Sequence, residues 1–377
     1  MIVAAVIGAL LLWTFVFYPL ISRLLAARKP SQSHPAPTSD ESWPHVLMLI
    51  AARDEAPHIA ARVRNALALD YPGSLEVVVV SDGSTDATAA EARAAGATVV
   101  ELPHVGKTAA LETALRNASA APDVVAFSDA TAVWPSDALR VLLAPLRRPD
   151  VGAVSGLVRY DYASSGLAAG FASYQRLIVA HRGHDGTWGS LTSVSGSISA
   201  TRWTVLAQPS GGTLPPALST DLLIPFEAAR RGLRTVFAPG AVSHERARAS
   251  AARELQSRVR LALSAYAFMA HAARHWASLP ATYRWQLVSH KVLRWLSPSL
   301  IVVAALALVL DTPEARVPVL LALGSLAVVC ALAYVRALNR VLGPVLFAAT
   351  VALGYLIGLW RFARGQRPAG WDPAEQR

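Results

Sequence analysis

The stretches that decide the fold are VLMLIAARDE (residues 46–55), LEVVVVSDGSTD (residues 75–86) and DVVAFSDAT (residues 123–131). Each begins with a short apolar run and carries acidic residues where that run ends. Short β-rich runs that alternate with longer helical stretches are typical of βαβ units, which build a parallel sheet. Ligands of such sheets bind in the crevice outside the carboxyl ends of the strands. We therefore predict an α/β fold in which Asp54, Glu55, Asp82 and Asp129 converge on one edge of a mostly parallel sheet.

The other elements of this domain, which we place at residues 45–250, follow from the same patterns. The expected strands are residues 46–51, 76–81, 98–101, 124–128, 151–160, 193–202 and 233–237, and the expected helices are residues 56–69, 85–95, 107–120, 136–147 and 221–231. The glycine-containing residues 183–189 are expected to form a loop. Trp188 in this loop either stacks on a ligand or packs in the core. His181 and His184 are expected to lie at the surface or to be hydrogen-bonded.

The composition points to a membrane protein. The chain has 377 residues, 53% of them hydrophobic, and a formal net charge of +10. The basic residues cluster beside apolar segments and are not interleaved with aromatic residues, which argues against a nucleic-acid partner. The single cysteine, Cys330, lies in an apolar run and has no second cysteine with which to form a disulfide. We expect it to be a small core or lipid-facing residue.

An N-terminal membrane anchor is expected at residues 1–22, which are almost entirely apolar and about long enough to cross a bilayer. A cleavable signal peptide, the alternative, carries its positive charge before the apolar stretch. Here Arg23, Arg28 and Lys29 follow it. By the positive-inside rule, the domain that follows is then cytoplasmic, in a multi-pass protein of the inner membrane. Residues 23–44, rich in proline, serine and histidine, are expected to form a linker.

The C-terminal part is expected to associate with the membrane. Residues 251–295 have a basic face, which indicates interfacial amphipathic helices or an ordinary solvated face. Residues 296–361 predict about three transmembrane helices. The expected spans are residues 296–310, 317–335 and 342–360, and residues 362–377 are expected to form a basic tail. Three crossings would place the tail outside, whereas Arg361, Arg364 and Arg367 favour the inside. Either one segment is interfacial or re-entrant, or the tail breaks the rule.

Asp82, Lys107 and Asp129 are candidates for ligand binding at the sheet edge. A carboxylate at Asp82 can accept a hydrogen bond from a nucleobase or a ribose, although its sequence also suits an ordinary turn. Lys107 begins a predicted helix, where a lysine opposes the dipole; it contacts an anionic diphosphate or is a solvated surface residue. Asp129 closes an apolar strand, where a divalent cation shared with a diphosphate would stabilise its charge. Alternatively, it caps the next turn.

The ordered segments AARDE, VVVVSDGSTD, GKTAAL, FSDAT, VSGSISATR and STDLLIPFEAARRGLRTVFAPGAVSHE resemble the family 2 glycosyltransferases, in particular their membrane-bound bacterial members. The resemblance covers about residues 46–260 and implies the Rossmann-like GT-A fold. It also implies that Asp54, Glu55 and Asp82 contact the nucleotide of a nucleotide-sugar donor. Lys107 would lie at the base or the diphosphate of that donor.

The same resemblance assigns the remaining site residues. Asp129, as the first acid of the DxD motif, would hold Mg²⁺ or Mn²⁺ beside the ribose and diphosphate. Asp221 would be the general base, and Gly196 belongs to the glycine-bearing segment on the acceptor side. Arg258 and Arg260 would contact the leaving diphosphate.

Three departures from the family pattern refine this expectation. Thr131 replaces the second acid of the DxD motif, so metal binding must depend on Asp129, the diphosphate and water. Thr220 stands where the base motif often has an acid. Val259 and Arg260 replace the last two residues of the QxxRW motif of processive synthases. We therefore expect inverting transfer of one or a few sugars, from a UDP-sugar to a lipid-linked or envelope glycan acceptor. Membrane lipid is a further expected partner. A processive exopolysaccharide synthase and a non-catalytic, nucleotide-sensing membrane subunit are the alternatives.

Overall fold

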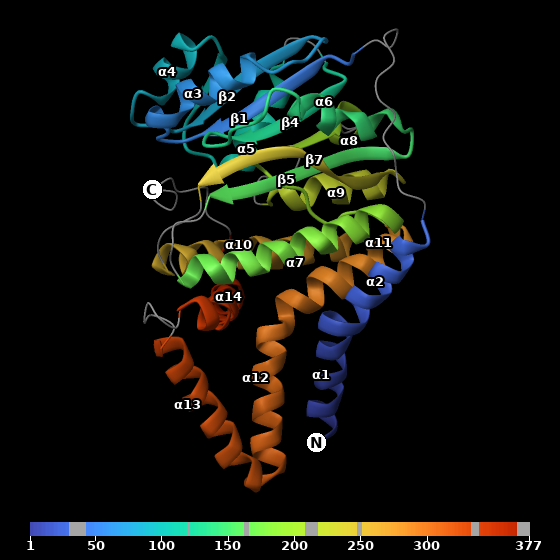
Figure 1. Ribbon diagram of the computed structural model, residues 1–377, viewed down its shortest axis with the longest axis vertical. Coiled ribbons are helices and arrows are strands. Elements are labelled where there is room, and N and C mark those ends of the chain that lie inside the picture. Colours follow the sequence, from blue (N-terminus) through green and yellow to red (C-terminus); the bar gives the residue numbers. More distant parts are fainter. Residues whose placement is uncertain are drawn as a thin grey trace.

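The computed structural model describes residues 1–29, 43–118, 121–161, 166–207, 218–246, 251–332 and 339–367. Within them, seven strands form one sheet in the order β3-β2-β1-β4-β6-β5-β7 (Figure 1). The strands are β1 (Val46–Ala52), β2 (Leu75–Asp82), β3 (Thr98–Leu102), β4 (Val124–Asp129), β5 (Val151–Asp161), β6 (Ser199–Arg202) and β7 (Arg234–Arg246). Only β6 runs antiparallel to its neighbours. The predicted mostly parallel α/β fold is confirmed, while most of the predicted linker and tail lies outside the described residues.

The central strands end together at one edge of the sheet. All seven residues of β1 are buried, as expected for a strand covered on both faces. Ala51 of β1 is in register with Val80 of β2 and with Asp129 of β4. The loops after these parallel strands therefore meet at one edge, which is where the acidic residues lie.

Helices cover both faces of the sheet. Met48 of β1 packs in one core with Ile59 of α3, whereas Leu49, on the opposite face, packs in a second core with Leu111 of α5 and Phe226 of α9. This alternation follows from the two-residue period of a strand. The helices of the first face are α3 (Ala56–Leu67), α4 (Thr88–Ala94) and α6 (Ala138–Leu143), followed by the 3-10 turn η2 (Ala144–Arg147). Those of the second face are α5 (Lys107–Arg116), α8 (Trp203–Leu206) and α9 (Thr220–Arg230).

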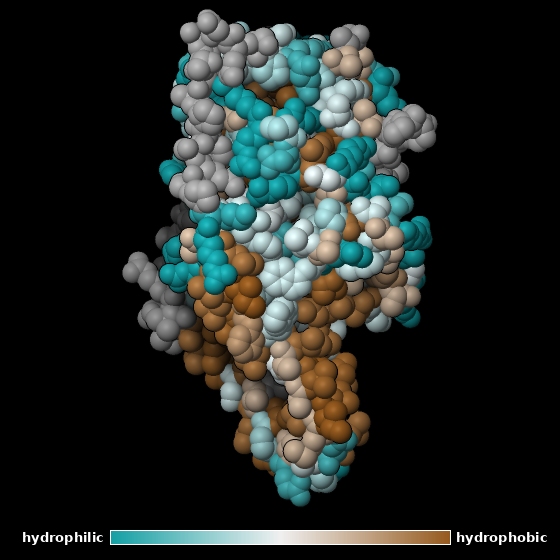
Figure 2. Space-filling model, turned by 90° about the vertical axis from the view of Figure 1, so that its right-hand side faces the viewer, coloured by the Kyte–Doolittle hydropathy of each residue, from teal (hydrophilic) through white to brown (hydrophobic). Residues whose placement is uncertain are grey.

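Two long helices separate the sheet from a group of apolar helices. In Figure 1, α7 (Gly166–Trp188) and α10 (Ala251–Arg274) lie directly beneath β5 and β7, and the apolar helices project away from them. Figure 2 shows that the surface of this projecting half is largely hydrophobic. Its elements are α1 (Ile2–Leu12), η1 (Trp13–Phe17), α2 (Tyr18–Ala27), α11 (Ala281–Gln286), η4 (Leu287–Val292), α12 (Leu293–Asp311), η5 (Pro313–Ala315), α13 (Arg316–Leu332) and α14 (Asn339–Ala363).

Three helical segments in the described part of the chain are long and apolar enough to cross a membrane: Ile2–Ala27, Ala281–Asp311 and Leu342–Ala363. One is N-terminal and two are C-terminal. Residues 281–295, expected among the interfacial helices, are continuous with the first C-terminal span. The second predicted C-terminal span falls on α13, which is 17 residues long.

The last helix, α14, packs along the layer formed by α7 and α10. Phe347, near its start, contacts Tyr174 of α7, and Phe362, near its end, contacts Tyr266 of α10. Between them, a Cβ at Gly354 would lie 2.4 Å from the Cβ of Arg258, so glycine permits close approach of the two helices. In Figure 1, α14 is foreshortened beneath α7 and α10, whereas α12 and α13 extend down the long axis.

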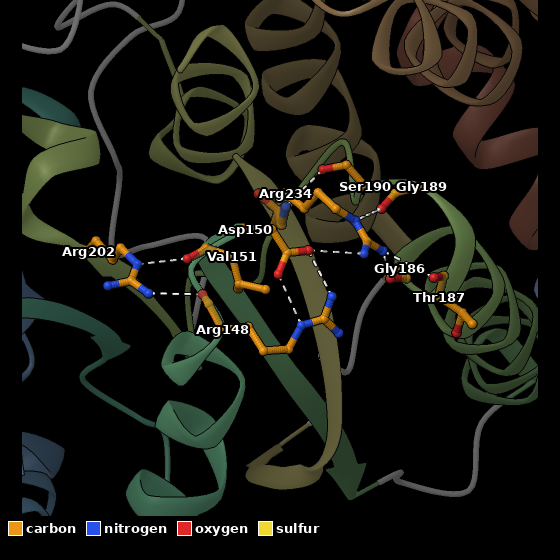
Figure 3. A network of polar contacts seen from close by, with 10 residues as sticks. Arg148, Asp150, Val151, Gly186, Thr187, Gly189, Ser190, Arg202 and Arg234 are labelled. Carbon is orange, nitrogen blue, oxygen red and sulfur yellow. Dashed lines mark hydrogen bonds and ion pairs between the residues drawn. The ribbon is translucent and has the colours of Figure 1, made fainter. Parts of the chain in front are cut away.

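The prediction of a loop at residues 183–189 is wrong, because α7 continues to Trp188. Figure 3 shows the reason: the guanidinium of Arg234 in β7 lies at the C-terminal end of this helix, held also by Asp150 at 3.4 Å. A cationic side chain that satisfies the last carbonyls of a helix stabilises its end. The carbonyls that accept from Arg234 are those of Gly186 (2.9 Å), Thr187 (3.1 Å) and Gly189 (2.7 Å).

Trp188 links this helix to the apolar helices α2 and α11. Its Nε1 donates to Ser22 Oγ of α2 at 2.9 Å, and its ring centroid lies 5.3 Å from that of Trp285 in α11. These contacts favour the packing interpretation over ligand stacking. His181, expected at the surface or hydrogen-bonded, is buried, and its ring centroid lies 5.3 Å from that of His290.

Candidate active site

Asp54 and Glu55 join the loops that follow β1 and β2. Asp54 Oδ1 accepts hydrogen bonds from the backbone N (2.7 Å) and the Oγ1 (3.1 Å) of Thr85. The backbone N of buried Glu55 donates to Thr88 Oγ1 at 2.8 Å. Asp54 has a φ of 51°, a left-handed conformation that is uncommon outside glycine and is often found at functional turns. The Asp54 carboxylate and the Glu55 backbone therefore connect the loop after β1 to the loop after β2.

Asp82, only 2% exposed, shapes the loop that leads into α5. Its Oδ1 accepts from the backbone N of Val105 at 2.7 Å, and its Oδ2 accepts from the backbone N of Gly106 at 3.0 Å. The Nδ1 of His104 lies 3.1 Å from the same Oδ2, and its Nε2 lies 3.0 Å from Arg53 Nη1. Asp82 thereby holds the first turn of α5 against the loop after β1.

Lys107, at the start of α5, faces two carboxylates. Its Nζ forms an ion pair with Asp129 Oδ1, and the other oxygen of Asp129 accepts from Ser197 Oγ at 2.8 Å. Lys107 also interacts electrostatically with Asp221. Burial alone would lower the pKa of Lys107, but the two carboxylates outweigh it and raise that pKa, so the ammonium remains charged. The structure thus brings together Lys107, Asp129 and Asp221, which the sequence analysis assigned to one site.

Asp221 lies in the first turn of α9, where the helix dipole favours a carboxylate. A Cβ at Gly196 would lie 3.1 Å from Asp221 Oδ1 and 3.1 Å from Lys107 Nζ, so the glycine backbone passes closely between the two side chains. The backbone N of Val194 donates to the Asp221 carbonyl at 2.9 Å, which fixes this segment to α9. Burial raises the pKa of Asp221, with Lys107 opposing that effect. A carboxylate with a raised pKa is a better proton acceptor near neutral pH.

Lys107, Gly196 and Asp221 line a small pocket at the carboxyl edge of the sheet. Its other lining residues come from β1, α5, β4, β6 and α9. The structure therefore brings together residues that the sequence places more than 100 positions apart. The lining residues are Leu49, Lys107, Leu111, Phe127, Ser128, Gly196, Ser199, Thr220, Asp221 and Ile224.

The two arginines predicted on α10 lie in different surroundings. Arg260 interacts electrostatically with both Lys107 and Asp221, so it belongs to this charged group. Arg258 instead pairs with Glu254, to which its Nε donates at 2.6 Å. Its guanidinium carbon also lies 5.0 Å from the ring centroid of Phe347 in α14. In this arrangement Arg258 joins α10 to α14.

Asp129 and its neighbours offer few side-chain ligands for a metal ion. Among the described residues, no three His, Cys, Asp or Glu side chains are grouped so that they could hold a metal. Mg²⁺ and similar ions are commonly held by one or two carboxylates together with substrate phosphates and water. Asp129, with the hydroxyl of Thr131 two positions later, fits a cation that arrives with a diphosphate. The Nζ of Lys107, which is paired with Asp129 Oδ1, would then have to move away from that oxygen.

Three polar residues at this site are not singled out by the sequence: Ser197, Arg182 and Lys291. Arg182 of α7 interacts electrostatically with Asp221, and the Nζ of Lys291 in η4 donates to Ser193 Oγ at 2.9 Å. A charged residue inside an apolar helix is costly and commonly functional, which is the signal that identifies Lys291. Ser197 and Arg182 carry no comparable signal, because serines and arginines are common in such segments.

Comparison with known proteins places the chain among sugar transferases. The family model described as "Glycosyltransferase like family 2" matches residues 44–272. The structure is similar to that of the mannosyltransferase PcManGT from Pyrobaculum calidifontis, which was solved in complex with GDP-Man and Mn²⁺. The TM-score is 0.70 at 25% identity, and the match covers 95% of this chain and 99% of that chain.

A curated relative agrees over a shorter region. The beta-monoglucosyldiacylglycerol synthase of Synechocystis sp. is 32% identical over 166 residues, which cover 39% of this chain and 33% of that protein. The chain thus spans about a third of the length of this relative. Because the family model covers more than half of the chain and the fold agrees over nearly all of it, the chain belongs to glycosyltransferase family 2 and is a transferase with the GT-A fold.

Proposed function

We propose that this glycosyltransferase moves a sugar from a nucleotide-sugar donor, expected to be a UDP-sugar, to a hydroxyl of a lipid or envelope glycan acceptor at the cytoplasmic face of the inner membrane. The observation that supports this most strongly is the cluster of Lys107, Asp129 and Asp221 at the carboxyl edge of the sheet. This edge is where open α/β sheets bind their ligands. The mannosyltransferase with the similar fold binds a nucleotide sugar with Mn²⁺.

The donor half of the site consists of the loops held by Asp54, Glu55 and Asp82, with Lys107 and Asp129 beyond them. We place the nucleoside over those loops, because they form the crevice beyond β1 and β2. Asp129 would hold Mg²⁺ or Mn²⁺ together with the diphosphate, and the cation would neutralise charge on the leaving group. Lys107, released from Asp129, and Arg260 would bind the same diphosphate oxygens.

Asp221 carries out the proton transfer in this proposal. Its carboxylate takes the proton of the acceptor hydroxyl as that oxygen forms a bond to the anomeric carbon of the sugar. The bond between this carbon and the donor diphosphate breaks, and the nucleoside diphosphate leaves with the electron pair. Because the nucleophile attacks the face opposite the leaving group, the anomeric configuration inverts. Gly196 leaves room for the acceptor oxygen between Asp221 and Lys107.

The acceptor is expected to arrive from the membrane. α7 and α10 lie between the sheet and the apolar helices (Figure 1), and Arg182 of α7 and Arg260 of α10 interact electrostatically with Asp221. We therefore place the acceptor entrance on this side of the site. The relative that resembles part of the chain is named as the synthase of a glycolipid. A lipid acceptor would therefore reach Asp221 without leaving the bilayer.

We further propose that α1, α12 and α13 cross the membrane while α14 lies at its cytoplasmic surface. The N-terminal amine of Met1 forms an ion pair with Asp311, so both lie at the end of the apolar helices remote from the sheet (Figure 1). α14 remains against α7 and α10. This arrangement keeps Arg361, Arg364 and Arg367 on the cytoplasmic side and satisfies the positive-inside rule.

The topology can be tested with single cysteines in a Cys330→Ala background. Thr312→Cys, at the remote end of α12, should react with a membrane-impermeant maleimide in intact cells. Arg364→Cys, just after α14, should react only after the membrane is permeabilised. Labelling of Arg364→Cys in intact cells would show that α14 crosses the membrane and that this topology is wrong.

The donor proposal is tested by calorimetry on the full chain in detergent, with UDP-glucose, UDP-galactose, UDP-GlcNAc and GDP-mannose, each with and without Mn²⁺. We expect binding of one UDP-sugar that is strengthened by the metal, followed by slow hydrolysis of that donor without an acceptor. Preference for GDP-mannose would replace the UDP-sugar assignment. Absence of binding to every donor would contradict the proposed function.

The pH dependence of transfer should reflect Asp221. This residue must be unprotonated to act as a base, and burial holds its pKa above 3.8, the ordinary aspartate value. Activity should therefore fall as the pH is lowered through the raised pKa, beginning at a higher pH than for an ordinary aspartate. The measurement is kcat/KM of the wild-type protein across the acid range, with donor binding followed in parallel. An acid limb at the ordinary aspartate position would argue against Asp221 as the base.

A further inference from the structure

We propose that Arg182 and Lys291 form a cationic subsite that binds a phosphate group on the acceptor, next to the hydroxyl that Asp221 deprotonates. This inference rests on the proposed function and names the class of acceptor, a hydroxyl-bearing phosphate such as a phospholipid headgroup. Arg182 comes from α7, which lies between the sheet and the apolar helices (Figure 1). Lys291 comes from η4, within the apolar segment Ala281–Asp311.

Lys291 is held firmly beside the acceptor half of the site. η4 is a π-helical segment that interrupts a long apolar helix, and such segments are frequent at functional sites. Its neighbours are fixed on both sides: Ser289 accepts from Trp13 Nε1 at 3.0 Å, and the Nδ1 of His290 lies 2.8 Å from Asp185 Oδ2. The Nζ of Lys291 donates to Ser193 Oγ, one residue before the amide that bonds the Asp221 carbonyl. An ammonium has three donors, so two remain for a ligand.

Arg182 approaches Asp221 from α7. It interacts electrostatically with Asp221 and with Lys291. Within the described part of the chain, the guanidinium of Arg182 has no hydrogen-bond or ion-pair partner. Burial lowers the pKa of Arg182. A guanidinium presents five donors in a planar fork that matches two phosphate oxygens. Its donors are thus available for an anionic ligand beside Asp221.

The balance of charge at the site favours an anionic ligand. Four basic side chains, Lys107, Arg182, Arg260 and Lys291, interact electrostatically with Asp221, and Asp129 adds a second carboxylate to this group. A donor diphosphate with its divalent cation is close to neutral in sum. A partly buried charge without a partner is costly, and a phosphate on the acceptor would compensate it.

The position of the two cations assigns this phosphate to the acceptor rather than to the donor. The donor diphosphate is expected at Lys107 and Asp129, on the sheet side of the pocket. In a single displacement, the acceptor and the leaving group lie on opposite sides of the anomeric carbon. Arg182 lies on α7, and Lys291 lies within the apolar segment Ala281–Asp311, so both belong to the side from which a lipid headgroup would enter.

The test compares acceptors and variants with the full chain in nonionic polyoxyethylene micelles, using the donor chosen by calorimetry. The acceptors are phosphatidylglycerol, which is a lipid with a phosphate and hydroxyls, sn-glycerol 3-phosphate, which has that chemistry without the lipid, and diacylglycerol, which lacks the phosphate. We expect kcat/KM for phosphatidylglycerol to exceed that for diacylglycerol by at least about tenfold. Efficient use of sn-glycerol 3-phosphate would identify a soluble source for the same chemistry.

Arg182→Gln and Lys291→Gln should each raise KM for the phosphate acceptor by about 10- to 100-fold, the range for a lost charged hydrogen bond. The donor Kd should not change, and the preference over diacylglycerol should shrink. The matched control is Arg176→Gln, an exposed arginine two turns earlier on α7, which should behave as wild type. Lys291→Arg and Arg182→Lys, which keep the charge, should retain most of the activity and so exclude misfolding as the cause.

The outcomes separate the two proposals. Equal or better use of diacylglycerol by the wild-type protein, or a donor Kd that weakens as much as the acceptor KM in both variants, would overturn the subsite while leaving the transferase assignment intact. Failure of the wild-type protein to bind or hydrolyse any nucleotide sugar would instead contradict the proposed function itself.

Discussion

Asp221→Asn should lower kcat for transfer by about 100- to 10,000-fold, the range for loss of a positioned general base. Asparagine has nearly the same shape as aspartate but cannot accept the proton of the acceptor hydroxyl. The donor site should survive, because Asp221 lies on α9 and the nucleotide is expected at the loops after β1 and β2. The measurements are single-turnover transfer rates and calorimetric donor affinity for the wild-type and variant proteins.

A second substitution in the same helix provides the control. Glu227→Gln, two turns later in α9, alters a carboxylate that pairs with Arg230 and Arg231 at 2.9 and 2.6 Å. It should affect stability more than chemistry. If Asp221→Asn retains near wild-type turnover, then another group removes the proton and our assignment of the base is incorrect.

Asp129→Asn should cause the second large loss. The carboxylate is the expected protein ligand of the metal, the partner of Lys107 and the acceptor of the Ser197 hydroxyl. Charge stabilisation by a bound metal contributes several kcal/mol, so turnover should fall by at least about 100-fold. Donor affinity should fall with it, and Mn²⁺ should no longer strengthen donor binding. Calorimetry and turnover measured across a Mn²⁺ titration test both effects.

Asp123→Asn is the matched control for this change. Asp123 immediately precedes the same strand at its other end, where its Oδ2 accepts from the backbone N of His45 at 2.8 Å. It should leave the metal response unchanged. Ser197→Ala, which removes only the hydrogen bond to Asp129, should have a smaller effect than Asp129→Asn. A metal response that persists in Asp129→Asn would place the cation elsewhere or show that it is dispensable.

The sequence predicts the convergence of three acidic residues at one edge of the sheet, for a physical reason. Parallel strands of similar length necessarily bring their carboxyl ends to one edge, so Asp54, Asp82 and Asp129 had to converge once the three runs were recognised as strands. The structure adds how they act locally: Asp54 bonds Thr85, and Asp82 bonds the backbone before α5. These uses depend on loop geometry, which no residue spacing reveals.

The membrane-facing side was predicted less well, because its contacts are long-range. The glycines at 183, 186 and 189 suggest a loop, yet Arg234, some 45 residues later, holds the end of α7 in helical form. The resemblance assigns Arg258 to ligand binding, whereas in the structure Glu254, one helical turn earlier, pairs with it where α10 packs against α14. The contact of Arg234 is long-range and cannot be identified from local patterns, because it exists only after α7 has packed against β7. The Glu254–Arg258 pair has helical i,i+4 spacing, a local signal that could have indicated it.

The most direct test of the account is the anomeric configuration of the transferred sugar. An α-linked UDP-sugar and a hydroxyl acceptor are incubated with the wild-type protein, and the product is examined by proton NMR before it can equilibrate. A single displacement with Asp221 as base predicts a β-linked product. An α-linked product would require a different mechanism and would contradict the role given to Asp221.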